Sequence, residues 1–321
     1  MNDTRTTDSI TIIGPAVIDV ITGPVAFSSA SLSQTVKTTR MTFGGDALNE
    51  SVVLSRFHKN ADLISKLGTD EAGARILSYL KNNGISARHV QVTEGLETSV
   101  HIVLVNEHGE RSFLMNESGS ARRLSARDIL PLIPRAAQIV SFASLFISPL
   151  LTLDVVENIF REIKKDRRRK LVVDVTRPKN GETLRDLEGI LPYVDYILPN
   201  DSEIASLTGI QDPHVNADLL VEAGAGCAVV KTGSKGCIVR TRESVTEIPA
   251  YRGADCIDTT GAGDTFAAGF LWALSEGYSP QECGRFGCAA ASCSIEAFGA
   301  VDGITSIDEP MRRYRQMKAL I

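Results

Sequence analysis

The sequence has few cysteines and no close cysteine pair. Its six cysteines all lie in the C-terminal third, and no two of them have the Cys-x-x-Cys spacing. A structural zinc site needs four closely spaced thiolate or imidazole ligands, so we predict free, buried thiols instead. Free thiols in turn indicate a reducing compartment. The six are Cys227, Cys237, Cys256, Cys283, Cys288 and Cys293.

Long hydrophobic runs and charged tails are also missing. Residues 136–153 carry no charge, but Pro149 and several hydroxyl side chains interrupt them. A membrane-spanning helix needs ~20 mostly apolar residues, so this stretch is more typical of a buried strand and loop. The first nine residues are polar and lack the apolar core of a secretion signal. With a net charge of -5 and no acidic or basic tail, we expect a cytoplasmic protein that binds neither membranes nor nucleic acid.

Strand and helix patterns alternate along most of the chain. Hydrophobic residues make up 43% of 321 residues, which is enough for a sizeable core. Alternation of this kind predicts one three-layer α/β/α domain over residues 1–321, with a mostly parallel central sheet and helices on both faces. The strand patterns are at 10–13, 61–66, 139–142, 171–175, 196–198 and 228–231, and the helical patterns are at 47–57, 70–83, 152–165, 263–275 and 280–296.

Residues 98–118 break this rhythm. Two strand-like runs flank residues 106–110, which contain Gly109, and this is the pattern of a β-hairpin. Residues 20–42 are strand-like as well. We therefore expect a small antiparallel sheet beside the main domain.

The residues Gly261-Ala262-Gly263-Asp264 stand directly before a helical pattern. Two glycines allow a tight turn and close approach of a ligand, and the free N–H groups of a helix start can hold an anion. A carboxylate beside them can accept a proton from an incoming hydroxyl during phosphoryl transfer. From these residues alone, a tight turn with Asp264 as a helix cap is the favoured interpretation.

The longer stretch 258–270 resembles the C-terminal signature of the ribokinase-like (PfkB) carbohydrate kinase family. Six further segments resemble landmarks of that family in the same order. The resemblance as a whole extends from about residue 10 to 310. These segments are 14–19, 44–49, 67–73, 199–203, 231–236 and 297–300.

The resemblance implies a kinase that uses ATP and Mg²⁺, with Asp264 as the catalytic base. The backbone of Gly261, Ala262 and Gly263 would form the anion hole. Sugar hydroxyls would bind a separate set of residues, namely Asp19, Gly44, Gly45 and Asn49. Asp46 lies in the same motif, and we favour a helix cap over a substrate contact there because aspartate is a preferred N-cap.

The resemblance also implies a nucleotide site at the other end of the sequence. Asn200 and Glu203 would act near magnesium through water, although capping of a helix is the alternative for both. The nucleotide itself would contact Thr232, Gly233, Ser234, Gly236 and, near adenine, Cys288. A buried thiol is an equally open interpretation of Cys288.

Many family members bind a monovalent cation such as K⁺ near the anion hole. Asp258, the Thr260 carbonyl and the segment around Gly299 occupy the matching positions. The segments 20–42 and 98–118 match the family's lid, which excludes water. In several members the lid pairs with a second lid, because exposed lid strands would otherwise leave unprotected edges, so we expect a homodimer through the lid. Arg111, on the lid, would face either the substrate or the solvent.

The phosphate acceptor implied by the resemblance is a primary hydroxyl of a ketose, an aldose or a sugar acid. Residues 139–147 carry no acidic side chain where some relatives use one on the sugar, which argues against D-ribose. One alternative is a nucleoside or pseudouridine kinase, although aromatics are only 6% and Phe43 is the one near the first two motifs. Another is a non-catalytic sugar sensor, against which the intact Asp264 argues.

Overall fold

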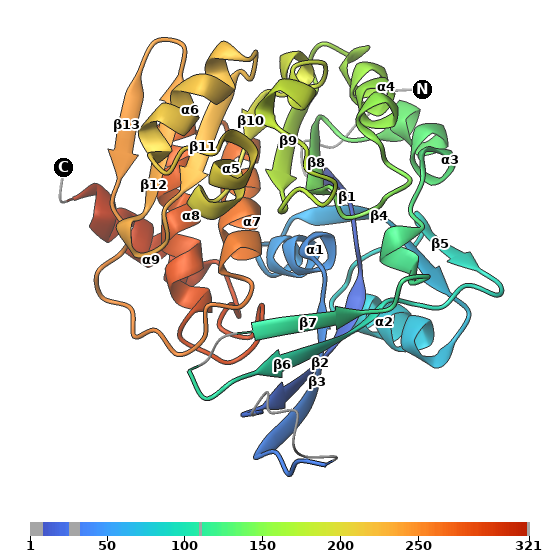
Figure 1. The fold of residues 1–321 in the computed structure, drawn as a ribbon. Helices are drawn as coiled ribbons and strands as arrows, with labels where there is room; N and C mark the ends of the chain where they lie inside the picture. Colours follow the sequence, from blue (N-terminus) through green and yellow to red (C-terminus); the bar gives the residue numbers. More distant parts are fainter. Residues whose placement is uncertain (1–8, 26–32, 109–110, 320–321) are drawn as a thin grey trace.

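A nine-stranded sheet runs through the computed structural model, which describes residues 9–25, 33–108 and 111–319 (Figure 1). Only β11–β12 and β12–β13 pair antiparallel. The strands read as apolar runs because helices cover both faces. In spatial order they are β13 (Val245–Ile248), β12 (Cys237–Thr241), β11 (Cys227–Lys231), β10 (Tyr196–Ile197), β9 (Lys170–Val175), β8 (Ile139–Leu145), β1 (Ser9–Ile13), β4 (Asn60–Gly68) and β5 (Val90–Thr93).

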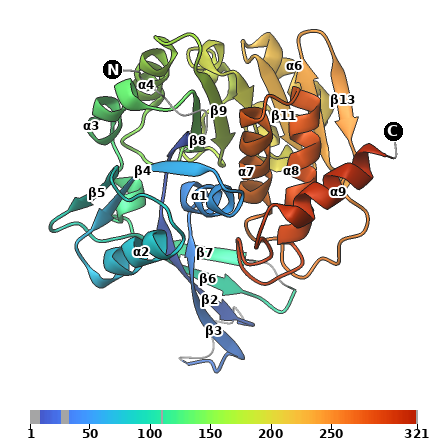
Figure 2. The same ribbon diagram turned by 180° about the vertical axis from the view of Figure 1, so that it is seen from behind.

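Helices pack on both faces of this sheet, as Figures 1 and 2 show from opposite sides. One face carries α1 (Asp46–Arg56), α2 (Glu71–Asn82), α7 (Ala262–Ser275), α8 (Pro280–Ser294) and α9 (Asp308–Lys318). The other carries α3 (Ala126–Ile129), α4 (Leu153–Lys164), α5 (Asp201–Thr208) and α6 (Pro213–Glu222). Short 3₁₀ turns occupy Ser120–Arg122, Leu130–Arg135, Leu184–Leu187, Leu191–Tyr193 and Gly233–Lys235. The three-layer α/β/α prediction is confirmed.

A smaller, four-stranded sheet lies at one end of the main sheet (Figure 1). We call it the lid sheet; its order is β3 (Thr38–Gly44), β2 (Val17–Gly23), β6 (Val100–Val105) and β7 (Arg111–Met115). The outer pairs are antiparallel, as predicted, but β2 and β6 are parallel. The reason is that β2 follows β1 and β6 follows β5, and those strands run in one direction. Residues 26–32 of the expected lid, and Gly109 and Glu110 of its hairpin, lie outside the described residues.

The prediction that Asp46 caps a helix is wrong. Gly45 is the N-cap of α1, with φ 92° and ψ 128°, and no side chain caps this helix. Because glycine adopts that non-helical conformation without strain, Asp46 already belongs to the first turn. Its carboxylate instead accepts a hydrogen bond from the hydroxyl of Ser144 on β8.

The cysteines are free thiols, as predicted, and all except the exposed Cys256 are buried. Within the described residues, no group of three or more His, Cys, Asp or Glu side chains could hold a metal ion. No helix in that part of the chain is long and apolar enough to cross a bilayer.

Glu50 on α1 is a carboxyl buried in the core. Its Oε2 accepts a hydrogen bond of 2.7 Å from Ser141 Oγ on β8, whereas its Oε1 has no hydrogen-bond partner among the described residues. Burial raises the pKa of Glu50 well above its ordinary value, and nearby carboxylates add to the shift. The folded protein therefore binds a proton there at pH values where the unfolded chain does not.

We predict that Glu50→Gln stabilises the protein more at pH 8 than at pH 5. The folded pKa is raised, so the stability contributed by Glu50 is full below about pH 4.3 and falls as pH rises from there toward the folded pKa. A neutral amide removes that loss. Thermal unfolding of both proteins across this range measures the effect, with Glu188→Gln at an exposed position as the control. Parallel pH profiles for wild type and Glu50→Gln would contradict the prediction.

Candidate active site

A cavity of about 310 Å³ lies between the main sheet and the lid sheet. Segments far apart in the sequence meet there, because the lid sheet covers the ends of β1 and β8 and the start of α7 (Figure 1). The lining includes seven residues that the sequence analysis selected, which are Asp19, Gly45, Asn49, Arg111, Thr260, Gly261 and Asp264. Asp46 and His101 line it as well.

The N-terminus of α7 opens into this cavity. Gly261 has φ 68°, and a Cβ atom on it would lie 2.1 Å from the Ala300 carbonyl oxygen, so only glycine fits. A Cβ on Gly263 would meet only the Lys231 ammonium, at 3.7 Å, so the space above this residue is open. No side chain among the described residues caps α7. The Ala262 N–H donates to the Thr259 carbonyl at 3.3 Å, whereas the N–H groups of Gly261 and Gly263 remain available to an anion.

Asp264 does not cap its helix. Its Oδ2 accepts a hydrogen bond of 2.6 Å from the Asn49 side-chain amide on α1, which joins two motifs 215 residues apart. Burial raises the pKa of Asp264, the Asn49 bond lowers it, and the Asp174 carboxylate raises it. The side chain is therefore a positioned carboxylate with a basicity above that of an ordinary aspartate.

Lys231 and Asp174 form a buried ion pair below this helix start. Lys231 Nζ donates to both carboxylate oxygens of Asp174, at 2.9 and 2.7 Å. Burial lowers the pKa of Lys231, but Asp174 and Glu203 outweigh that effect and raise it, so the cation persists. The sequence analysis assigned neither residue a role. A charged residue within the apolar strand β9 and another at the end of β11 were the signals that could have found them.

Asn200 and Glu203 form a reciprocal capping box at the start of α5. Asn200 Oδ1 accepts from the Glu203 N–H at 2.8 Å, and Glu203 Oε2 accepts from the Asn200 N–H at 2.7 Å. Burial raises the pKa of Glu203 to about 7, with Lys231 lowering it and Asp174 raising it. The capping alternative is thus realised, next to the buried ion pair. Glu203 is the carboxylate of this capping box, and a magnesium ion that keeps its water shell would contact it only through water.

The expected nucleotide loop joins β11 to β12. Gly233 and Ser234 are exposed, whereas Gly236 is buried with φ 105° and leaves no room for a Cβ, which would lie 1.9 Å from the Ile248 carbonyl oxygen. The Thr232 N–H donates to the Gly236 carbonyl at 2.8 Å and closes the turn.

Cys288 lies in the core on α8, against the residue that follows this loop. Its Sγ is 3.7 Å from Cys237 Sγ, and only 6% of the residue is exposed. The structure therefore favours a buried thiol over an adenine contact.

Asp19 projects from β2 into the cavity. Its Oδ1 is buried and has no hydrogen-bond partner in the described part of the chain, although His101 Nδ1 of β6 lies 3.3 Å away. A Cβ on Gly44 would lie 2.1 Å from Asp19 Oδ2, so glycine is needed beside this carboxylate. An unpartnered buried oxygen suits a sugar hydroxyl donor. His101 was not selected from the sequence.

Arg111 reaches from β7 of the lid sheet to the loop before α7. Its guanidinium donates to Asp258 Oδ1 at 2.5 Å and to the hydroxyl of Thr260. Asp258 Oδ1 also accepts from the Thr260 N–H at 3.0 Å, and Oδ2 accepts from the Gly299 N–H at 3.1 Å. The solvent-facing alternative for Arg111 is thereby excluded. Arg111 therefore places a positive charge against Asp258, where the resemblance implied a monovalent cation.

The geometry agrees with what the chain is similar to. The pfkB family of carbohydrate kinases matches residues 7–307. An uncharacterized sugar kinase of Archaeoglobus fulgidus is 31% identical over 253 residues, which cover 78% of this chain and 97% of that protein. A nucleoside kinase of Methanocaldococcus jannaschii is 25% identical, over 95% of this chain and 96% of that one.

The fold is also similar to that of solved kinases. The ribokinase of Arabidopsis thaliana, solved with ribose and ATP, aligns with a TM-score of 0.81 over 96% of this chain and 99% of that chain, at 23% identity. The chain therefore belongs to the pfkB family of carbohydrate kinases, and it is a sugar or nucleoside kinase of the ribokinase type.

Proposed function

We propose that this protein transfers the γ-phosphate of ATP to a primary hydroxyl of a ketose, an aldose or a sugar acid. The observation that carries the proposal is the Asp264 carboxylate, which Asn49 holds in the cavity beside the uncapped start of α7. A general base next to an anion site is the arrangement that phosphoryl transfer requires.

Each group in the cavity has a part in this proposal. Asp19 accepts hydrogen bonds from the sugar hydroxyls, and the Asn49 amide bonds a further hydroxyl. Together the two side chains orient the sugar. Asp264 then takes the proton of the attacking hydroxyl, while the backbone N–H groups of residues 261–263 stabilise the charge on the transferring group. Asn200 and Glu203 would hold a magnesium ion through water ligands, and such an ion would supply positive charge to the ATP phosphates.

A nucleoside is the second candidate substrate. Phe43, the aromatic residue noted in the sequence, stacks on Tyr79 at 3.9 Å between ring centroids and does not line the cavity. Phe113 of β7 does line it and is 54% exposed. A nucleobase could stack on this ring, and this observation favours the alternative.

We further propose that the outer face of the lid sheet pairs with a second copy of this chain. Paired residues of neighbouring strands put Met41, Ile102 and Leu114 on the face opposite Asp19 and His101. All three are large apolar side chains with 42% to 56% exposure. A row of exposed apolar side chains on a sheet needs a cover, and a second lid sheet supplies a matching one.

For the base, we predict that Asp264→Asn lowers kcat at least ~10²-fold while ATP binding persists, because an amide cannot take the hydroxyl proton. In the wild type, kcat should fall on the acid side with a midpoint above the ordinary aspartate value of about 4, since burial raises the pKa of Asp264. ADP release and nucleotide titration measure both effects. Asp201→Asn, at an exposed site on α5, is the control. Near-normal turnover of Asp264→Asn would overturn the mechanism.

For Arg111, we predict that the wild-type rate is the same in potassium and in tetramethylammonium salts, because the guanidinium already neutralises Asp258. Arg111→Met should lower both the activity and the melting temperature. Potassium should partly restore the activity and the melting temperature of this variant, because it replaces the missing positive charge. Arg75→Met, which removes an exposed arginine on α2, serves as the control. A strict potassium requirement in the wild type would disprove this role.

For the lid interface, we predict that the double variant Ile102→Lys/Leu114→Lys is monomeric where the wild type is a dimer. The added ammonium groups of one copy would repel those of the other. Removing these charges from water would also cost much free energy. Sedimentation equilibrium measures the mass. Val245→Lys, at a residue on β13 that is 54% exposed, should leave the dimer intact. A monomeric wild type would remove the proposal.

A further inference from the structure

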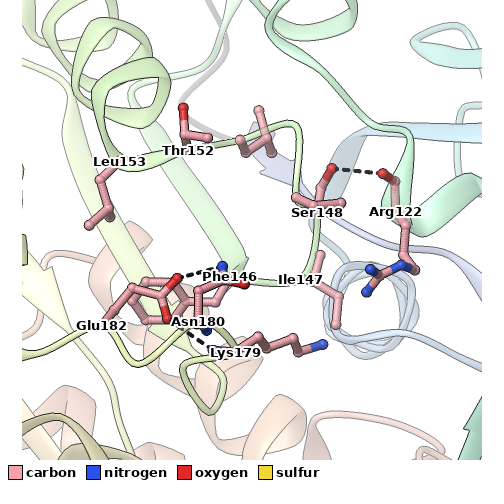
Figure 3. A pocket seen from close by; sticks show the side chains of 11 residues that line it. Arg122, Phe146, Ile147, Ser148, Thr152, Leu153, Lys179, Asn180 and Glu182 are labelled. Carbon is pink, nitrogen blue, oxygen red and sulfur yellow. Dashed lines mark hydrogen bonds between the residues drawn. The ribbon is translucent and has the colours of Figure 1, made fainter. Parts of the chain in front are cut away.

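A second cavity, of about 220 Å³, adjoins the candidate active site. Ile147 lines both cavities, so the two spaces meet at this side chain. The second cavity lies where β8 and β9 end, between the segments 146–153 and 179–182 (Figure 3). Phe146 begins the first segment with φ 75°, a conformation that non-glycine residues rarely adopt.

Two cationic side chains, Arg122 and Lys179, line this second cavity. Figure 3 shows their charged ends reaching toward the side chain of Ile147, where the two cavities meet. Arg122 Nε donates only to the Glu117 carbonyl, at 3.3 Å. Within the described residues neither cation has an ion pair. Burial and the nearby Arg122 charge lower the pKa of Lys179, whereas Asp46 raises it.

The acidic residue of the cavity does not neutralise them. Glu182 accepts hydrogen bonds from the backbone N–H groups of Lys179 and Asn180, at 3.0 and 2.9 Å. It also accepts one from the Asn180 side-chain amide, at 2.9 Å. In Figure 3 it lies at the far side of the cavity from the two cationic groups. Ser148 Oγ donates to the Arg122 carbonyl at 3.2 Å and to the Leu124 carbonyl at 2.8 Å, which fixes the backbone that carries the guanidinium.

Two like charges that converge without a counterion form a site for an anion. Arg122 and Lys179 contribute +2 and Glu182 contributes -1, so the cavity carries one net positive charge, which matches a carboxylate better than a phosphate dianion. A guanidinium fork also fits the planar carboxylate.

Resting on the kinase activity proposed above, we infer that the substrate is a sugar acid whose carboxylate binds Arg122 and Lys179. Its hydroxyls then lie at Asp19 and Asn49, and its terminal hydroxyl lies at Asp264. Ile147 lines both cavities, so one molecule extended past this side chain would enter both.

The test compares three acceptors of matched length, namely a six-carbon sugar acid, the neutral sugar of the same skeleton and its phosphate ester. We expect the acid to have the highest kcat/KM. The double variant Arg122→Gln/Lys179→Gln should raise KM for the acid ~10- to 100-fold, as the loss of charge-assisted hydrogen bonds does, with kcat and the KM for the neutral sugar unchanged.

Two control variants separate charge from folding. Arg122→Lys/Lys179→Arg keeps both charges and should retain the preference for the acid. Arg123→Gln/Lys165→Gln removes two exposed charges outside both cavities and should change nothing. The melting temperature of each variant without ligand monitors the fold.

Direct binding distinguishes failure of this inference from failure of the kinase proposal. Calorimetric titration of the wild type with the sugar acid should show binding that the Gln double variant loses, even if no acceptor yields ADP. Equal use of acid and neutral sugar, a preference for the phosphate ester, or a double variant altered only in its KM for ATP would each overturn the inference.

Discussion

The Lys231–Asp174 ion pair is the interaction on which the chemistry of the site depends. Burial favours the protonated forms of three carboxyl groups here, those of Asp174, Glu203 and Asp264. Repulsion by neighbouring carboxylates adds to this in Glu203 and Asp264. The buried ammonium of Lys231 opposes this tendency in all three. In Asp264 the Asn49 hydrogen bond and the Lys231 ammonium both lower the pKa, so both favour the ionised form that can take a proton from a sugar hydroxyl.

The parts of the site that sequence could predict are those that leave a local trace. Gly261 needs a positive φ and has no room for a Cβ, and Asp264 follows it in the first helical turn, so a short string carries both. The Lys231–Asp174 pair leaves no such trace. Its members are 57 residues apart and meet because β10 lies between β9 and β11, which is a property of the sheet order and of no segment by itself.

Local rules also failed where the tertiary structure offers a stronger partner. Aspartate is a good N-cap, yet Gly45 takes the cap position and frees Asp46 to bond Ser144 on the neighbouring β8. Arg111 belongs to a strand that could face solvent, yet the lid sheet places it over Asp258, which lies 147 residues further along the chain. The alternation of strands and helices, in contrast, predicted the three layers well, because burial of both sheet faces imposes the same apolar pattern on every central strand.

The same strands of the lid sheet supply both a cavity-facing polar surface and an outer apolar surface. Side chains alternate between its faces, so Asp19 and His101 turn to the cavity while Met41 and Ile102 turn outward. A slip of one residue in the register of β2 would exchange the two faces and expose the carboxylate. Arg111 also ties this sheet to the loop before α7. The proposed second copy on the outer face would therefore rest on the same strands that hold Asp19 and Arg111 at the cavity.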